Sequence, residues 1–222
     1  MPATASFEVD WSAIDTVFVD MDGTLLDLAF DNFFWLELVP ARYAERHGLT
    51  PEAARARLTS RFDASAGTLA WYCLDHWTRS LDLDLRALKR SHSHLIRFLP
   101  RAPEFLASVR ARSKRLWLVT NAHRDTLRVK ADQTGVDRLV DSVVCSHDLD
   151  APKESSEFWI ELERRQPFDP KRTLLIEDSL AVLDAARAFG LEHTLAIRRP
   201  DSRLPARHIA AFRAVDGVAD LV

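Results

Sequence analysis

The chain has 222 residues, of which 47% are hydrophobic, and a formal net charge of −3 at pH 7. This length and apolar content suffice for one buried core with a smaller inserted or appended subdomain, and they argue against a disordered chain. A charge so close to neutral disfavours binding to nucleic acid or to an anionic membrane, so a small soluble partner is expected.

Targeting signals and cysteine chemistry are not indicated by the sequence. No apolar run reaches the roughly 18 to 20 residues that a transmembrane helix needs. The stretch from Met1 to Asp15 lacks the basic start and apolar middle of a secretion signal, so we expect a cytoplasmic protein. Cys73 and Cys145 lie far apart and outside any metal-binding spacing, which predicts ordinary buried thiols and neither a disulfide nor a zinc site.

Short runs rich in β-branched and aliphatic residues recur along the chain and predict buried parallel strands. The clear runs are residues 16–19, 116–119, 142–145 and 173–176, with a weaker one at 193–197. Helical patterns lie between the later runs, at residues 125–133, 154–165 and 180–189. Such an alternation is typical of an α/β fold, here Rossmann-like with a parallel sheet.

The first two runs are separated by a long segment with no comparable strand pattern. It contains helix starts such as Thr50-Pro51-Glu52 and many aromatic residues at helical spacing. We therefore expect a helical subdomain at residues 29–98, inserted after the first strand of an α/β core formed by residues 1–28 and 99–222. Most of the aromatic side chains should form the core of this insert, which leaves one or two to face a ligand.

Two acidic residues directly follow the first predicted strand, in the segment Asp20-Met21-Asp22-Gly23-Thr24. The carboxyl ends of parallel strands are where α/β sheets place their sites. Paired carboxylates there can hold a hard cation and leave one oxygen free to attack, while Gly23 permits a tight turn and Thr24 offers donors to an anion. An Asp-rich turn that caps a helix would also explain the segment.

Further polar segments follow the later predicted strands. Thr120 and Asn121 close the second run and can hydrogen-bond phosphate oxygens, and Lys153, after the third, can neutralise a phosphate and help keep a carboxylate ionised. Glu177 and Asp178 end the fourth run as a second acidic pair able to complete a magnesium site. Each alone is explained by capping, solvation or a helix dipole, but capping preferences do not explain their order on successive strand ends.

This order resembles the haloacid dehalogenase superfamily over essentially the whole chain, with residues 20–24, Thr120, Lys153 and the pair Glu177-Asp178 matching its four motifs. The inserted helices stand where that family has its helical cap. The resemblance implies the strand order 3-2-1-4-5. It also implies a Mg²⁺ ion held by Asp20, Glu177, Asp178 and the backbone carbonyl of Asp22.

The resemblance further implies a mechanism. Asp20 attacks phosphorus and forms an aspartyl-phosphate, while Lys153 absorbs negative charge. Asp22 protonates the leaving oxygen and then activates water. The presence of Asp22 disfavours dehalogenation, which needs no proton on its leaving group.

Three stretches, residues 20–35, 68–77 and 120–123, also resemble the bacterial nucleotidases that hydrolyse GMP and IMP. The phosphate ester would then be a purine nucleoside monophosphate, with Phe30, Asp31, Asn32 and Trp35 as candidates to meet the nucleoside, although packing explains these four at least as well. Alternatives are a sugar-phosphate or phosphoglycolate phosphatase and a β-phosphoglucomutase-like phosphotransferase. A catalytically silent binding protein is the alternative from another class, but it would be expected to lose the nucleophile, the acid or a metal ligand.

Overall fold

The computed structural model describes residues 8–222, so the first part of the segment from Met1 to Asp15 lies outside the described residues. A six-stranded parallel sheet runs through the molecule in the order β3-β2-β1-β4-β5-β6. The strands are β1 (Thr16–Val19), β2 (Arg115–Thr120), β3 (Ser142–Cys145), β4 (Thr173–Glu177), β5 (His193–Ile197) and β6 (Ala214–Val215). The expected α/β class and the order of the first five strands are confirmed.

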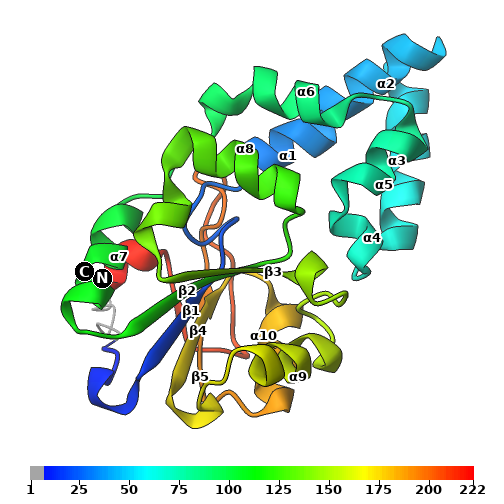
Figure 1. Cartoon of the computed structure of the whole chain (residues 1–222). Helices are drawn as coiled ribbons and strands as arrows, with labels where there is room; N and C mark the ends of the chain where they lie inside the picture. The colour runs from blue at the N-terminus through cyan, green and yellow to red at the C-terminus, as the bar shows by residue number, and fades with distance from the viewer. Residues whose placement is uncertain (1–7) are drawn as a thin grey trace.

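Helices cover both faces of the sheet, so its central strand β1 is buried throughout. On β1, Val17 and Val19 pack into one hydrophobic cluster and Phe18 into the other, as the two-residue period of a strand requires. The first cluster includes α7 (Ala102–Ala111) and α8 (Arg124–Thr134), and the second includes α9 (Ser156–Arg165) and α10 (Leu180–Phe189). Figure 1 shows these two pairs of helices on opposite sides of the sheet.

The segment between β1 and β2 is helical before α7, and Figure 1 shows its helices together beyond one end of the sheet. They are α1 (Ala29–Phe33), α2 (Val39–His47), α3 (Pro51–Ser65), α4 (Leu69–Tyr72), α5 (Leu74–Leu81) and α6 (Leu85–Ser91). A π-helical turn, Phe34–Leu38, joins α1 to α2 just before Pro40. Proline has no N–H and its ring crowds the carbonyl four residues earlier, so the helix widens there.

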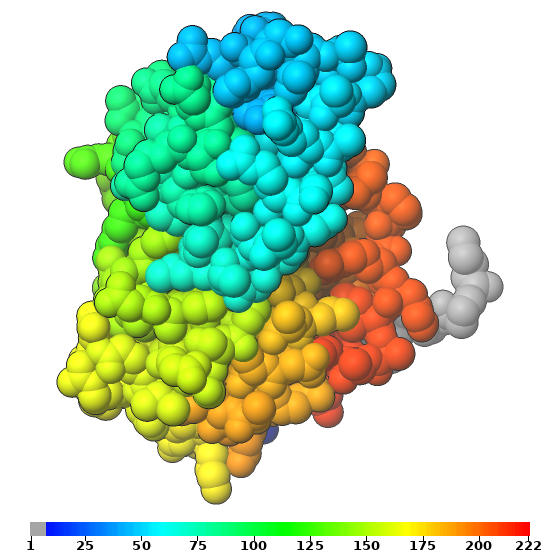
Figure 2. Space-filling view, turned by 90° about the vertical axis from the view of Figure 1, so that its right-hand side faces the viewer, coloured from blue at the N-terminus to red at the C-terminus, as the bar shows by residue number. Residues whose placement is uncertain are grey.

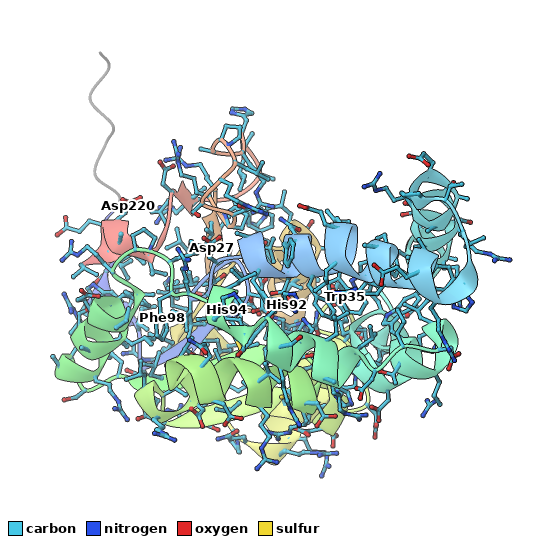
Figure 3. All side chains as sticks on the ribbon, turned by 90° about the horizontal axis from the view of Figure 1, so that it is seen from above. Asp27, Trp35, His92, His94, Phe98 and Asp220 are labelled. Atoms are coloured by element: carbon cyan, nitrogen blue, oxygen red, sulfur yellow. The ribbon has the colours of Figure 1, made fainter. Side chains whose placement is uncertain are left out.

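Two connecting segments attach these helices to the sheet, and they run antiparallel to each other. The backbone N–H of Asp27 donates to the carbonyl of Arg97 at 2.9 Å, and that of Leu99 donates to the carbonyl of Leu25 at 2.8 Å. Asp27 and Phe98 mark the two connections in Figure 3, with Trp35 farther along the first helical segment. The chain therefore leaves and re-enters the sheet region through one narrow junction.

Two expectations about the rest of the chain can be compared with the structure. Among residues 8–222, no helix combines the length and the apolar character needed to cross a bilayer. Both cysteines are free thiols, but only Cys145 is buried. The expectation of a buried thiol is wrong for Cys73, because this half-buried residue caps α5 and its Sγ accepts a hydrogen bond from the backbone of His76.

Candidate active site

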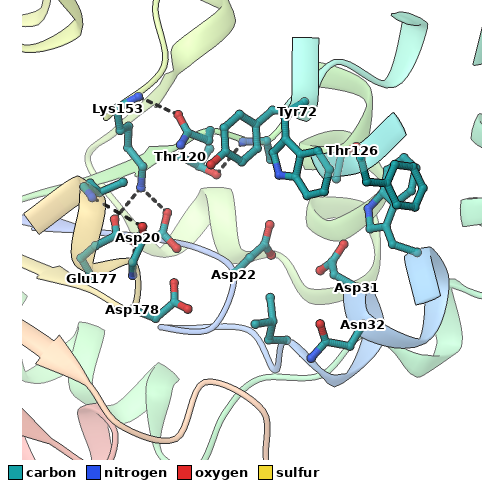
Figure 4. Close-up of a pocket in the computed structure, with 18 of the residues that line it drawn as sticks. Asp20, Asp22, Asp31, Asn32, Tyr72, Thr120, Thr126, Lys153, Glu177 and Asp178 are labelled. Atoms are coloured by element: carbon teal, nitrogen blue, oxygen red, sulfur yellow. Dashed lines mark hydrogen bonds and ion pairs between the residues drawn. The ribbon is translucent and has the colours of Figure 1, made fainter. Parts of the chain in front are cut away.

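A pocket of about 400 Å³ opens between the sheet and the helices of the insert. Its sheet side carries the polar residues Asp20, Asp22, Thr120, Asn121, Lys153, Glu177 and Asp178. Its helical side carries Asp31, Asn32, Lys89 and the aromatic residues Trp35, Phe62, Trp71, Tyr72 and Trp77. Figure 4 shows Asp20, Glu177 and Asp178 together at one end of this space, Asp22 in the middle, and Asp31 near aromatic rings at the other end.

Lys153 lies at the centre of the polar side and is buried with its partners. Its Nζ is 2.5 Å from Oδ1 of Asp20, 2.7 Å from Oε2 of Glu177 and 2.9 Å from the carbonyl oxygen of Val119. Burial alone would lower the pKa of Lys153, but the charges of Asp20 and Glu177 outweigh it and raise that pKa above its usual value. Lys153 therefore stays an ammonium and holds Asp20 at the end of β1.

Three carboxylates crowd together around this lysine. Asp20, Glu177 and Asp178 each offer an oxygen atom within 4.8 Å of the other two. Burial, followed by the charge of Glu177, raises the pKa of Asp20 to about 8, and burial raises the pKa values of Glu177 and Asp178 to about 7. Lys153, with Arg207 4.0 Å from Oδ2 of Asp178, supplies only part of the positive charge that two buried carboxylates and one half-buried carboxylate require.

These residues fit a hard divalent cation. All the side-chain donors are oxygens, the type of ligand that Mg²⁺ prefers. Gly23 allows the loop after β1 to approach them, because its φ is +82° and an added Cβ would lie 2.8 Å from Cγ of Asp178. Both oxygens of Glu177 already have donors, Lys153 and the backbone N–H of Ser179, so Asp20 and Asp178 have the freer oxygens.

Asp22 is half-buried and has a different partner. Its Oδ1 lies 2.5 Å from Nζ of Lys130, a buried lysine of α8. Burial raises the pKa of Asp22, and the ammonium of Lys130 opposes the shift. Lys130 also binds Asp31, whose second partner is Lys89. Burial alone would raise the pKa of Asp31, but these two lysines outweigh it and hold that pKa at about 2.

Further contacts connect the inserted helices to the loops of the sheet. The hydroxyl of Tyr72 in α4 donates to Oε1 of Glu154 at 2.5 Å, in the loop that carries Lys153. Arg86 of α6 pairs with Asp75 and with Asp125 at the start of α8. In the space-filling view, the cyan helices α3–α5 lie directly against the yellow-green residues that follow β3 (Figure 2). One side of the pocket is therefore closed by the insert.

The structure brings most of the candidate residues to this pocket, but not all of them. Thr120, Asn121, Asp31, Asn32 and Trp35 line it. Gly23 and Thr24 do not line the pocket, and Oγ1 of Thr24 is buried without a hydrogen-bond partner. Phe30 is buried in the hydrophobic core, so packing accounts for it.

Asn121 is engaged differently from the sequence expectation. Its amide nitrogen donates to Oε2 of Glu154 at 2.9 Å, and its amide oxygen accepts from the backbone N–H of Lys153 at 2.9 Å. Both ends of the amide therefore hold the loop of Lys153 in place. Thr120 remains available at the pocket, although its hydroxyl oxygen accepts from the backbone N–H of Ala122.

Lys89 and Lys130 were missed by sequence reasoning, although the sequence contains a signal for both. Each stands at an apolar position of its helix pattern, Lys89 four residues after Leu85 and Lys130 three residues after Leu127. A lysine on the buried face of a helix requires a buried partner. That signal could have identified both residues as parts of a polar site.

Comparison with known proteins agrees with this geometry. The family model for haloacid dehalogenase-like hydrolases matches residues 14–190. The chain is 39% identical, over 194 residues, to the GMP/IMP nucleotidase YrfG of Escherichia coli (strain K12) and to that of Shigella flexneri. Each alignment covers 87% of this chain and 87% of the relative.

Solved structures show the same fold. A HAD phosphatase from Thermococcus onnurineus has a TM-score of 0.78 at 21% identity and covers 93% of this chain and 95% of its own. A putative beta-phosphoglucomutase from Thermotoga maritima has a TM-score of 0.65 at 18% identity and covers 94% and 97%. The sequence match and the fold confirm the resemblance: the chain belongs to the haloacid dehalogenase-like hydrolases.

Proposed function

We propose that this hydrolase is a magnesium-dependent phosphomonoesterase that works through an aspartyl-phosphate at Asp20, and that its substrates are GMP and IMP. The observation that carries the proposal is the joint placement of Asp20, Lys153 and the pair Glu177–Asp178 at one end of a pocket whose other end is aromatic. The 39% identity to a GMP/IMP nucleotidase supports the choice of substrate. Residues 29–98 would act as a cap over the remaining core.

In the first half-reaction, an oxygen of Asp20 attacks phosphorus in line with the ester oxygen. The bond from phosphorus to the ester oxygen breaks as the bond to Asp20 forms, and Asp22 gives its proton to the departing oxygen. The nucleoside leaves and the phosphoryl group remains on Asp20. Lys153, 2.5 Å from Asp20, favours the carboxylate form of the attacking group and offsets negative charge.

In the second half-reaction, water replaces the nucleoside. Asp22, now a carboxylate, takes a proton from the water as its oxygen attacks phosphorus, and the bond to Asp20 breaks. Phosphate is released with Asp20 restored as a carboxylate and Asp22 as an acid. One residue can serve both steps because the leaving oxygen and the attacking water occupy the same side of phosphorus.

Asp20, Asp178 and the backbone carbonyl of Asp22 would hold the Mg²⁺ ion, with Glu177 beside them. When bound, the ion would supply positive charge against the phosphate oxygens. The crowding of three carboxylates around one lysine supports this role. Their raised pKa values also agree with a site that gains from a cation.

The aromatic end of the pocket suits a nucleobase. A volume of about 400 Å³ falls in the usual range for small-molecule sites, and flat aromatic side chains can stack on a purine. Of the residues in α1 and the π-helical turn, Asp31 is bound by two lysines and Asn32 donates to Asp201 at 2.8 Å. Trp35 is therefore the strongest of the three candidates to contact the base.

A phosphate-release panel tests the proposal. GMP, IMP, AMP, glucose 1-phosphate, phosphoglycolate and an aryl phosphate would each be assayed with magnesium and with EDTA, with Asp20→Asn as the control. We expect GMP and IMP to be turned over above the others, and we expect EDTA and Asp20→Asn to abolish release. Preferred release from another ester would retain the mechanism and reject the substrate, whereas no magnesium-dependent release would reject both.

A further inference from the structure

A buried row of alternating charges connects Asp22 to the inserted helices. Nζ of Lys130 lies 2.5 Å from Oδ1 of Asp22 and 2.5 Å from Oδ2 of Asp31, and Nζ of Lys89 lies 3.0 Å from Oδ1 of Asp31. Both lysines are only 1% exposed. The order of the charged side chains is therefore Asp22, Lys130, Asp31, Lys89. They come, in the same order, from the loop that follows β1, from α8, from α1 and from α6.

Packing alone does not require these charges. Buried ion pairs contribute little net stability, because desolvation offsets their attraction, and apolar residues of similar volume often replace them without loss. Lys89 also lies over an aromatic ring, 4.1 Å from the centroid of Phe34, which accounts for part of its placement. Lys130 lies 5.9 Å from the centroid of Phe30, but it also reaches from a helix of the core to Asp22, a half-buried acid that lines the pocket.

The position of Lys130 on its helix and the two carboxylates around its ammonium fix the orientation of its side chain. Lys130 lies one turn after Thr126 on α8, and Thr126 lines the pocket, so the helix presents both residues on the same side. The two carboxylates contact its ammonium from different elements. An ammonium held in this way can fix the orientation of a short acidic side chain that is itself partly exposed.

On the basis of the proposed function, we infer that Lys130 is a positioning residue that holds the carboxylate of Asp22 in the orientation from which it meets the leaving oxygen. Lys130 binds Oδ1 of Asp22, so Oδ2 is the oxygen that carries the proton. Asp31 is the counter-charge that keeps Lys130 in place. Without Lys130, Asp22 would lose the donor to its Oδ1 and, once it has given up its proton, would face Asp31 as a like charge, so its side chain would rotate away.

This role has a kinetic signature that a merely structural role lacks. Departure of an alkoxide, as from a nucleoside monophosphate, needs a proton from Asp22, whereas para-nitrophenolate is a good leaving group that needs much less help. The ratio kcat/KM covers the steps up to departure of the leaving group. Lys130→Met should therefore lower kcat/KM for GMP by about 10²-fold or more and lower it far less for para-nitrophenyl phosphate.

Two further variants separate positioning from folding. Arg86→Met removes another cation that joins α6 to α8. Its partners are Asp75 and Asp125 and it does not line the pocket, so this variant should leave the ratio of GMP to aryl-phosphate kcat/KM close to that of the wild type. The triple variant Lys130→Met/Asp31→Asn/Lys89→Met neutralises Asp31 together with both of its buried lysine partners, so none of these three positions is left with an unpaired charge. We expect it to restore the melting temperature lost in Lys130→Met while the preference for the aryl ester persists.

Several results would overturn the inference. Equal losses of kcat/KM for both esters in Lys130→Met, the same change of ratio in Arg86→Met, or full GMP turnover in a folded Lys130→Met enzyme would each exclude a positioning role. If the wild-type enzyme ignores GMP and IMP but hydrolyses another alkyl phosphate, the substrate proposal fails. The comparison is then made with that alkyl ester, and the role of Lys130 is judged separately.

Discussion

Substitution of Lys153 by methionine should reveal how much the buried charges of the site depend on one ammonium. Methionine matches lysine in length, so Lys153→Met removes the charge with little change in packed volume. The wild-type ammonium contacts Asp20, Glu177 and the carbonyl of Val119, all within 2.9 Å. In the variant, two carboxylates with exposed fractions of 5% and 2% lose their counter-charge.

The expected loss of stability is large. Removal of one partner from a buried ion pair typically costs roughly 3–5 kcal/mol, because the remaining charge stays desolvated. Asp20 and Glu177 can limit that loss by taking up protons. Near neutral pH, Lys153→Met should therefore lower the free energy of unfolding by up to about this amount.

The loss should also depend on pH. Lys153 lowers the pKa of Asp20 and of Glu177, which nevertheless stand at about 8 and about 7, so its removal raises both folded-state values further. A carboxyl with a higher pKa in the folded than in the unfolded protein stabilises the fold below the unfolded value, and this contribution is lost as pH rises through the folded value. Below about pH 7 both proteins keep these protons in the folded state and lose stability in parallel, so the gap between variant and wild type widens as pH rises through about 7 and about 8, where the wild-type carboxyls ionise and those of the variant do not.

Urea unfolding in EDTA at several pH values, followed by tryptophan fluorescence, measures this effect. The double variant Lys153→Met/Glu177→Gln serves as the control, because it removes one of the two uncompensated charges and should recover part of the loss. Equal unfolding free energies for Lys153→Met and wild type, or a gap that narrows as pH rises, would refute the reasoning.

Other measurements probe the neighbouring contacts. Gly23→Ala should lower the free energy of unfolding by roughly 1–3 kcal/mol and weaken Mg²⁺ binding, because φ is +82° and the new Cβ would lie 2.8 Å from Cγ of Asp178. Thermal melting and magnesium titration measure the two effects, and unchanged stability and Mg²⁺ affinity would contradict the prediction. Tyr72→Phe deletes the hydrogen bond to Glu154, which joins α4 to the loop of Lys153. Loss of about 1 kcal/mol from this contact should raise KM about fivefold with little change in kcat, and a fall in kcat without a rise in KM would contradict the prediction. Magnesium should raise the melting temperature more at about pH 8 than at about pH 6. The pKa values of Asp20 and Asp178 are about 8 and about 7, so at the lower pH the ion must displace protons from both carboxyls. A magnesium-induced shift in melting temperature that is independent of pH would count against a site built from these carboxylates.

Much of the fold and the polar end of the pocket followed from local patterns. The run at residues 173–176 predicted β4, and the helix 180–189 has the predicted bounds, because apolar period and capping residues act over a few positions. Parallel strands end at one edge of a sheet, so residues placed directly after them must converge. For this reason Asp20, Lys153 and Glu177 could be assigned to one site before any contact was known.

The roles of other residues depend on how distant segments meet. Asn121 was expected to face phosphate, but the approach of Glu154 and the backbone of Lys153 engages both ends of its amide. Lys130 contacts carboxylates that are 108 and 99 residues away along the chain. A sequence pattern records the spacing within one element, whereas the partner of a buried charge is decided by which helix faces pack together. The sequence by itself therefore determined the fold class and the residues at the strand ends, and only the tertiary structure decided which charges hold them in position.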